Sequence, residues 1–297
     1  MSVEVLHGRR PESPDDTYEE FSVSSHQNIG RFGLRVYSPT QKQMREKGLP
    51  KVVVPYTSGW AQGLDETNTI CERLAREAHV YAVSTKLPEG EHDIDEMVPF
   101  RADVLHATID VLQKDITYDL PIFPYGYSRG SAPNAVVAGD RPHELVGAGF
   151  IAPTWFSKNK SALQLLSLGV TEGIESLTRG SLRDRWGLIR IGRNAGRELA
   201  THPWEYRRDV FAISKYSRPE DLVERLSQVP RIAVVAGRRD KLCPAYGILE
   251  VAQQLQMSNF ERPVDLLELD VSHLQFFDNV VAMRGIANQI QKSHNNE

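Results

Sequence analysis

Short apolar runs recur along the chain from residue 51 onward, separated by segments with helical periodicity. Six of these runs are too short for helices and rich in strand-forming residues: 52–56, 80–84, 122–125, 146–152, 232–236 and 264–269. Helical spacing is clearest at Ala102, Leu105 and Ile109, and again near Ile286. Strands joined by helices are typical of βαβ units, whose sheet is covered on both faces. The sequence therefore predicts an α/β protein with a mostly parallel central sheet and helices on both faces.

Two segments depart from this pattern. Residues 18–38 alternate apolar and polar side chains around Gly30, which is typical of an antiparallel hairpin. Residues 155–229 contain helical runs without a convincing strand, so they interrupt the alternation of strands and helices. We therefore expect one core domain, formed by residues 1–154 and 230–297, and a helical cap inserted between its two parts at 155–229.

The expected cap is basic, with 13 Lys and Arg against 9 Asp and Glu, although the whole chain has a formal net charge of -4. Eight arginines and three acidic residues fall within residues 179–208. One interpretation is a set of solvated helix faces, because long helices need charged exteriors. The other is an electropositive lid that attracts anionic substrates. The sequence leaves both interpretations open.

The remaining composition narrows the class of protein. With 25% charged residues and a small net charge, the chain resembles an ordinary soluble protein, and we expect no binding to nucleic acid. It has no run of about 18 apolar residues that could span a bilayer, and its N-terminal residues lack the apolar stretch of a signal peptide. We therefore expect a cytoplasmic protein without a transmembrane segment. Cys71 and Cys243 lack the spacing of a C-x-x-C motif or a disulfide scaffold, which predicts free thiols.

Ser128 lies between two glycines, where an apolar run changes into a helical pattern. Residues 126–130 read GYSRG, a match to G-x-S-x-G. A nucleophile elbow needs a strand, a sharp turn at the serine and a following helix, and residues 131–138 are compatible with that helix. Side chains at Gly126 and Gly130 would collide with the neighbouring strand and helix. The alternative is an ordinary serine in a tight turn, and the rest of the chain must decide between the two.

A serine hydroxyl becomes a good nucleophile when a base takes its proton, and the usual base is a histidine held by a carboxylate. Asp240 lies four residues after the apolar run 232–236, and His273 lies four residues after the run 264–269. The carboxyl ends of parallel strands share one edge of a sheet. We therefore expect Ser128, Asp240 and His273 to converge, although they are far apart in the sequence.

Together these features resemble the α/β-hydrolase superfamily over about residues 18–292. The resemblance rests on the hairpin, the elbow, the G-x-x-D-x-x-x-P stretch at 237–244, the late histidine, and a cap placed before the acid-bearing strand. The order serine, aspartate, histidine along the chain also matches that family. The resemblance implies that Ser128 is the nucleophile, that His273 is the general base and then the acid, and that Asp240 holds the imidazole.

The resemblance further implies two backbone N–H donors for a developing oxyanion. One is Arg129, directly after the nucleophile. The second normally comes from the loop after the third strand, where family members often carry His-Gly followed by a bulky residue. This chain has Ser58, Gly59 and Trp60 there instead, so it stays open whether Gly59 or Trp60 donates the second N–H. The Trp60 ring can also pack into the core or against the cap.

We therefore expect a serine hydrolase that cleaves carboxylic esters of small molecules through an acyl-enzyme. One alternative is the same triad acting on thioesters or transferring the acyl group to another acceptor. Another is a non-catalytic binding protein on a hydrolase scaffold. We expect no nucleotide cofactor, because there is no G-x-G-x-x-G or Walker segment, and no metal site in the acidic stretch at 90–96, which lacks EF-hand and H-E-x-x-H spacing. The acyl group, the alcohol and the oligomeric state are not predicted.

Overall fold

The computed structural model describes residues 3–9, 18–25, 29–59, 64–86, 97–116, 120–155, 168, 171, 216, 218–258, 261–276 and 280–295. Within these residues the strands form one nine-stranded sheet in the order β1-β2-β3-β5-β4-β6-β7-β8-β9. The strands are β1 (Val3–Arg9), β2 (Tyr18–Ser25), β3 (Gly30–Tyr37), β4 (Val53–Thr57), β5 (Tyr81–Lys86), β6 (Tyr125–Tyr127), β7 (Ala148–Ile151), β8 (Ile232–Gly237) and β9 (Val264–Leu269). The α-helices are α1 (Gln41–Lys47), α2 (Leu64–Ala78), α3 (Met97–Val111), α4 (Ser131–Asp140), α8 (Pro219–Leu226), α9 (Ala245–Ser258) and α10 (Val280–Asn295).

The sheet is antiparallel at one end and parallel through the rest. Strands β1, β2 and β3 pair antiparallel, β3 pairs antiparallel with β5, and the strands from β5 through β4, β6, β7 and β8 to β9 are parallel. The predicted hairpin is therefore confirmed as β2 and β3. The first strand, β1, was not predicted, and it extends the sheet beyond the hairpin.

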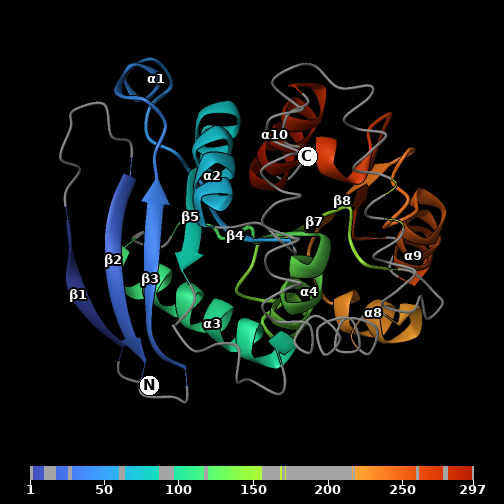
Figure 1. Ribbon diagram of the computed structural model, residues 1–297, viewed down its shortest axis with the longest axis horizontal. Coiled ribbons are helices and arrows are strands. Elements are labelled where there is room, and N and C mark those ends of the chain that lie inside the picture. The colour runs from blue at the N-terminus through green and yellow to red at the C-terminus, as the bar shows by residue number, and fades with distance from the viewer. Residues whose placement is uncertain are drawn as a thin grey trace.

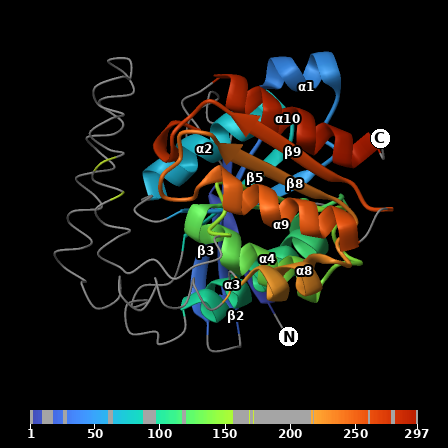
Figure 2. The same cartoon turned by 90° about the vertical axis from the view of Figure 1, so that its right-hand side faces the viewer.

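Helices cover both faces of the sheet, as the sequence predicted. In Figure 1, α2 and α10 lie on one side of the sheet and α3, α4 and α8 on the other. The turned view in Figure 2 places α9 in the same layer as α4 and α8, in agreement with the contacts that α8 makes with both helices. Strands β7 and β8 are buried along their whole length, which explains their nearly continuous apolar sequences.

One predicted strand begins later than expected. Before Tyr125, the apolar run at 122–125 forms an isolated bridge between Ile122 and Val53 and a hydrogen bond from the Phe123 N–H to the Val53 carbonyl, and regular pairing begins with β6 at Tyr125. Pro124 explains the difference, because proline has no N–H with which to continue the hydrogen-bonded ladder. Strand β6 ends at Tyr127, so it leads directly into the turn at Ser128.

Most of the predicted cap at 155–229 lies outside the described residues, and so does the whole basic stretch at 179–208. Helix α8 lies in the described part of this segment, and its Leu222 and Leu226 are buried in the core. Trp155 is also buried, with its ring centroid 4.8 Å from that of Phe150. Among the helices in the described ranges, none is long and apolar enough to cross a membrane.

Candidate active site

Ser128 sits at a sharp turn between β6 and α4, with a short 3-10 helix at Ser128–Gly130. Its φ of 49° lies in the left-handed region, which is unfavourable for a residue with a side chain. A Cβ on Gly126 would lie 2.6 Å from the carbonyl oxygen of Gly130, and a Cβ on Gly130 would lie 2.3 Å from that of Thr57. The predicted need for glycine on both sides of the serine is therefore confirmed.

Buried polar side chains hold this turn in place. The Ser131 hydroxyl donates a hydrogen bond to the carbonyl oxygen of Ser128 and accepts one from the Thr154 N–H at 3.1 Å. The Asn134 side chain donates to the carbonyl oxygen of Gly149 at 3.0 Å. Because Thr154 follows β7 and Gly149 lies within it, these bonds attach the turn and the start of α4 to the neighbouring strand.

The loops that follow β8 and β9 stay paired beyond the ends of the strands. The Arg239 N–H donates to the carbonyl oxygen of Val271 at 3.2 Å. Gly237 permits this close approach, since a Cβ there would lie 2.6 Å from the same oxygen. Asp240 directly follows Arg239, and His273 comes two residues after Val271. The pairing of the two strands therefore brings Asp240 and His273 to the same edge of the sheet.

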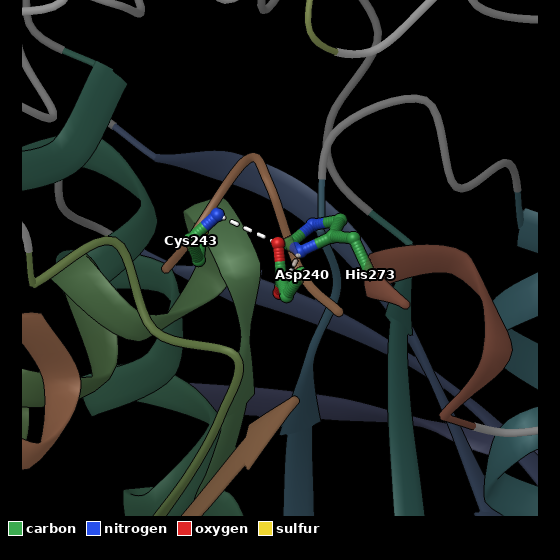
Figure 3. A group of neighbouring side chains, drawn as sticks. All are labelled: Asp240, Cys243 and His273. Carbon is green, nitrogen blue, oxygen red and sulfur yellow. Dashed lines mark hydrogen bonds and ion pairs between the residues drawn. The ribbon is translucent and has the colours of Figure 1, made fainter. Parts of the chain in front are cut away.

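The three side chains form one hydrogen-bonded row. His273 Nε2 lies 2.9 Å from Ser128 Oγ, and His273 Nδ1 lies 2.7 Å from Asp240 Oδ2. All three residues are buried. The second carboxylate oxygen, Asp240 Oδ1, accepts a hydrogen bond of 2.7 Å from the N–H of Cys243 (Figure 3). The structure thus brings together Ser128, Asp240 and His273, as the order of strand-end loops predicted.

The electrostatics of the row favour a protonated imidazole. Burial alone lowers the pKa of His273, but the charge of Asp240, the neighbouring Cys243 and hydrogen bonds to both residues outweigh it and raise this pKa well above its ordinary value. In the neutral imidazole, a proton on Nδ1 that binds Asp240 leaves Nε2 free to accept the proton of the Ser128 hydroxyl. The arrangement can therefore take a proton from Ser128 and stabilise the positive charge that results.

Gly59 and Arg129, the expected oxyanion residues within the described ranges, both lie beside the serine. A Cβ on Gly59 would lie 2.6 Å from Cδ1 of Tyr127 and 3.2 Å from Cβ of Ser128, so the main chain after β4 packs closely against the turn. Arg129 is the second residue of the 3-10 helix at the turn. Trp60 lies outside the described residues. The choice between Gly59 and Trp60 as a donor therefore stays a prediction.

Two neighbours of the row were not singled out from the sequence. The Tyr127 hydroxyl donates a hydrogen bond of 2.6 Å to the backbone carbonyl of His273. Cys243 and Cys71 form no disulfide, as predicted, and both are buried, but Cys243 had no expected role. Within the described ranges, a group of side chains that could hold a metal ion consists of Asp240, Cys243 and His273. The acidic stretch at 90–96 lies outside the described residues.

Comparisons with solved structures agree with this architecture. A thermostable carboxyl esterase from Bacillus coagulans has a TM-score of 0.62 and 15% identity, over 94% of this chain and 98% of that one. A putative lipase from Acinetobacter baumannii has a TM-score of 0.61 and 14% identity, over 95% and 93%. A peroxisomal α/β-hydrolase from Saccharomyces cerevisiae has a TM-score of 0.60 and 13% identity, over 100% and 90%.

By sequence, no family model and no curated protein matches the chain. The structural likeness, together with the sheet order and the turn at Ser128, defines the class of fold. The chain has the α/β-hydrolase fold.

Proposed function

We propose that this chain is a serine hydrolase that cleaves carboxylic esters through an acyl-enzyme. The observation that carries the proposal is the continuous row of hydrogen bonds from Ser128 Oγ through both ring nitrogens of His273 to Asp240. The strained turn supports it, because a buried serine in the left-handed region is costly and such strain concentrates at functional sites. Structures of similar fold are described as a putative lipase and a carboxyl esterase, which favours esters as the substrate class.

In the first half of the reaction, Ser128 Oγ attacks the ester carbonyl carbon while His273 Nε2 takes the hydroxyl proton. The oxyanion of the tetrahedral intermediate accepts hydrogen bonds from the Arg129 N–H and from that of Gly59 or Trp60. When the intermediate collapses, the bond to the alcohol breaks, and the alcohol leaves with the proton from Nε2. An ester between Ser128 and the acyl group remains.

In the second half, water takes the place of the serine hydroxyl. His273 Nε2 removes a proton from this water, and the resulting nucleophile attacks the acyl carbon. Collapse of the second intermediate breaks the bond to Ser128 Oγ, which recovers its proton from Nε2. Asp240 binds the proton on Nδ1 throughout, so it orients the ring and stabilises its positive charge without being protonated.

The test is hydrolysis of a p-nitrophenyl ester by Ser128→Ala, with Ser258→Ala as a remote control for the same substitution. Ser258 lies at the end of α9, where its hydroxyl donates a hydrogen bond to the backbone carbonyl of Leu255. We expect Ser128→Ala to lose activity by several orders of magnitude, because members of a triad act as a unit. The control should keep wild-type turnover, and a fluorophosphonate probe should label Ser128 alone. Turnover by Ser128→Ala close to that of the wild type would refute the proposal.

A further inference from the structure

Cys243 brings a thiol into the buried row, and the ester mechanism does not use it. Figure 3 shows Asp240 between Cys243 and His273. One ligand atom from each side chain lies within 4.8 Å of the other two, and all three residues are buried. The residues come from the two loops that follow β8 and β9. The sheet therefore assembles a carboxylate oxygen, a sulfur and an imidazole nitrogen at one point.

This set of donors selects the kind of metal ion. Sulfur, imidazole and carboxylate ligands bind Zn²⁺ and softer divalent cations such as Cd²⁺, whereas Mg²⁺ and Ca²⁺ prefer oxygen ligands throughout. The ligand atoms of a tetrahedral zinc site lie roughly 3.5 Å apart, given bonds of about 2.0 to 2.3 Å. Small movements of Cys243 and His273 in their loops would therefore bring three ligands to bonding distance.

We propose that Asp240, Cys243 and His273 form an inhibitory site for Zn²⁺ and for related thiophilic cations. Three protein ligands are the number found in zinc sites that keep one position for water or another small ligand. The Asp240 carboxylate already carries a negative charge and the Cys243 thiol gains one when the metal displaces its proton, so the buried ion is neutralised by its ligands.

The bound ion changes which nitrogen of His273 carries the proton. Coordination needs the lone pair of Nδ1, the nitrogen that faces Asp240, so the ring proton moves from Nδ1 to Nε2. The thiol proton leaves to solvent, the carboxylate stays ionised, and no electron is transferred. A protonated Nε2 cannot accept the Ser128 proton across the 2.9 Å that separates the two atoms. Inhibition thus rests on the proposed function, but binding of the ion does not.

Inhibition is tested with the full-length protein, freed of metal and kept in a phosphine reductant so that thiol oxidation is excluded. Hydrolysis of a p-nitrophenyl ester is followed while Zn²⁺, Cd²⁺ or Mg²⁺ is added. We expect Zn²⁺ and Cd²⁺ to inhibit reversibly, with recovery after a chelator is added, and Mg²⁺ to have no effect. Each variant is normalised to its own metal-free activity. Cys243→Ala should raise the midpoint concentration for Zn²⁺ at least tenfold.

Cys71→Ala is the matched control, since Cys71 is the other buried cysteine outside any disulfide and lies on α2. It should leave the Zn²⁺ midpoint unchanged. Equal midpoints for the wild type and Cys243→Ala would overturn the inhibitory site. So would inhibition by Mg²⁺ at the same concentrations, because that ion does not require sulfur.

Binding is measured separately with Cd²⁺ on Ser128→Ala, whose ultraviolet absorption reports a cadmium–thiolate bond without any turnover. We expect saturation at one equivalent of Cd²⁺. The double variant Ser128→Ala, Cys243→Ala should show no such band. Absence of a Cys243-dependent band overturns the site. If the band appears but the wild type hydrolyses no ester, the metal site stands and the proposed function fails. The two failures are therefore distinguishable.

Discussion

The Tyr127 hydroxyl donates a hydrogen bond of 2.6 Å to the backbone carbonyl of His273, and their two rings stack with centroids 5.2 Å apart. Tyr127 also directly precedes Ser128, and its ring lies against Gly59. One side chain therefore connects the loop of the proposed base, the turn of the proposed nucleophile and the loop after β4. We infer that Tyr127 positions the imidazole through these contacts.

Tyr127→Phe should lower kcat/KM roughly fivefold, mainly through kcat, because the carbonyl of His273 loses a buried hydrogen bond worth about 1 kcal/mol. Tyr125→Phe is the matched control, since Tyr125 lies in the same strand and its buried hydroxyl donates to Gln289 at 2.9 Å. Both variants should lose similar stability in urea denaturation, while only Tyr127→Phe loses activity. Equal kinetics for the two variants would show that Tyr127 is merely structural.

Asp240→Asn should reduce kcat by about three to four orders of magnitude through the wrong imidazole tautomer. The Cys243 N–H donates to Asp240 Oδ1, so the amide oxygen of asparagine would take that place. The amide NH₂ would then face His273 Nδ1 and force the ring proton onto Nε2. Steady-state kinetics measure the loss, and thermal denaturation checks that the fold is retained. Activity within tenfold of the wild type would contradict this role.

The pH dependence of kcat/KM should show a midpoint above about 6.5, the ordinary pKa of histidine. Burial lowers the pKa of His273, but Asp240 and Cys243 raise it by more, so the net shift is upward. The base must be neutral to accept a proton, and kcat/KM therefore rises as pH increases through this raised pKa. The pH profile of kcat/KM is recorded with a p-nitrophenyl ester in buffers that contain a metal chelator. A midpoint at or below 6.5 would contradict the upward shift.

The sequence predicted the parts of the site that depend on local patterns and on one rule of topology. The glycines around Ser128 are needed locally, and the carboxyl ends of parallel strands must share an edge, so Asp240 and His273 could be placed. The contact between Tyr127 and His273 could not, because it joins residues 146 positions apart through a hydroxyl and a backbone oxygen. Whether this contact forms depends on how closely the loop that carries His273 folds back onto β6. The spacing of apolar residues in the sequence does not determine that distance.

The errors in strand position have a similar origin. A short apolar run marked residues 122–125 as a strand, but Pro124 delays regular pairing until Tyr125. Strand β1 was not predicted from the sequence. It belongs to the sheet through its pairing with β2, in which Val5 lies opposite Val23. Cys243 had no predicted role, since its contact with Asp240 is made across a turn and follows from no sequence pattern.

Gly130→Ala should destabilise the protein by about 1 to 3 kcal/mol, the usual cost of forcing an extra methyl into a packed site. Its Cβ would meet the carbonyl oxygens of Thr57 and Ser58, which are backbone atoms and cannot simply rotate away. Gly33→Ala is the control, because its Cβ would lie at an ordinary 3.5 Å from Cβ of Lys86. Urea denaturation measures both. If Gly130→Ala is as stable as Gly33→Ala, the turn is less tightly packed than the structure indicates.

Ser128→Gly should be more stable than Ser128→Ala by about 1 kcal/mol, although both remove the hydroxyl and should be equally inactive. The φ of 49° at this position is costly for alanine, whereas glycine adopts it readily. Gln253, an exposed residue inside α9, provides the control. There, glycine should be less stable than alanine by up to about 1 kcal/mol, because the helix favours alanine. Denaturation of all four variants tests whether the stability difference between glycine and alanine has opposite signs at the two positions. If Ser128→Ala were more stable than Ser128→Gly, the backbone at Ser128 would not be strained.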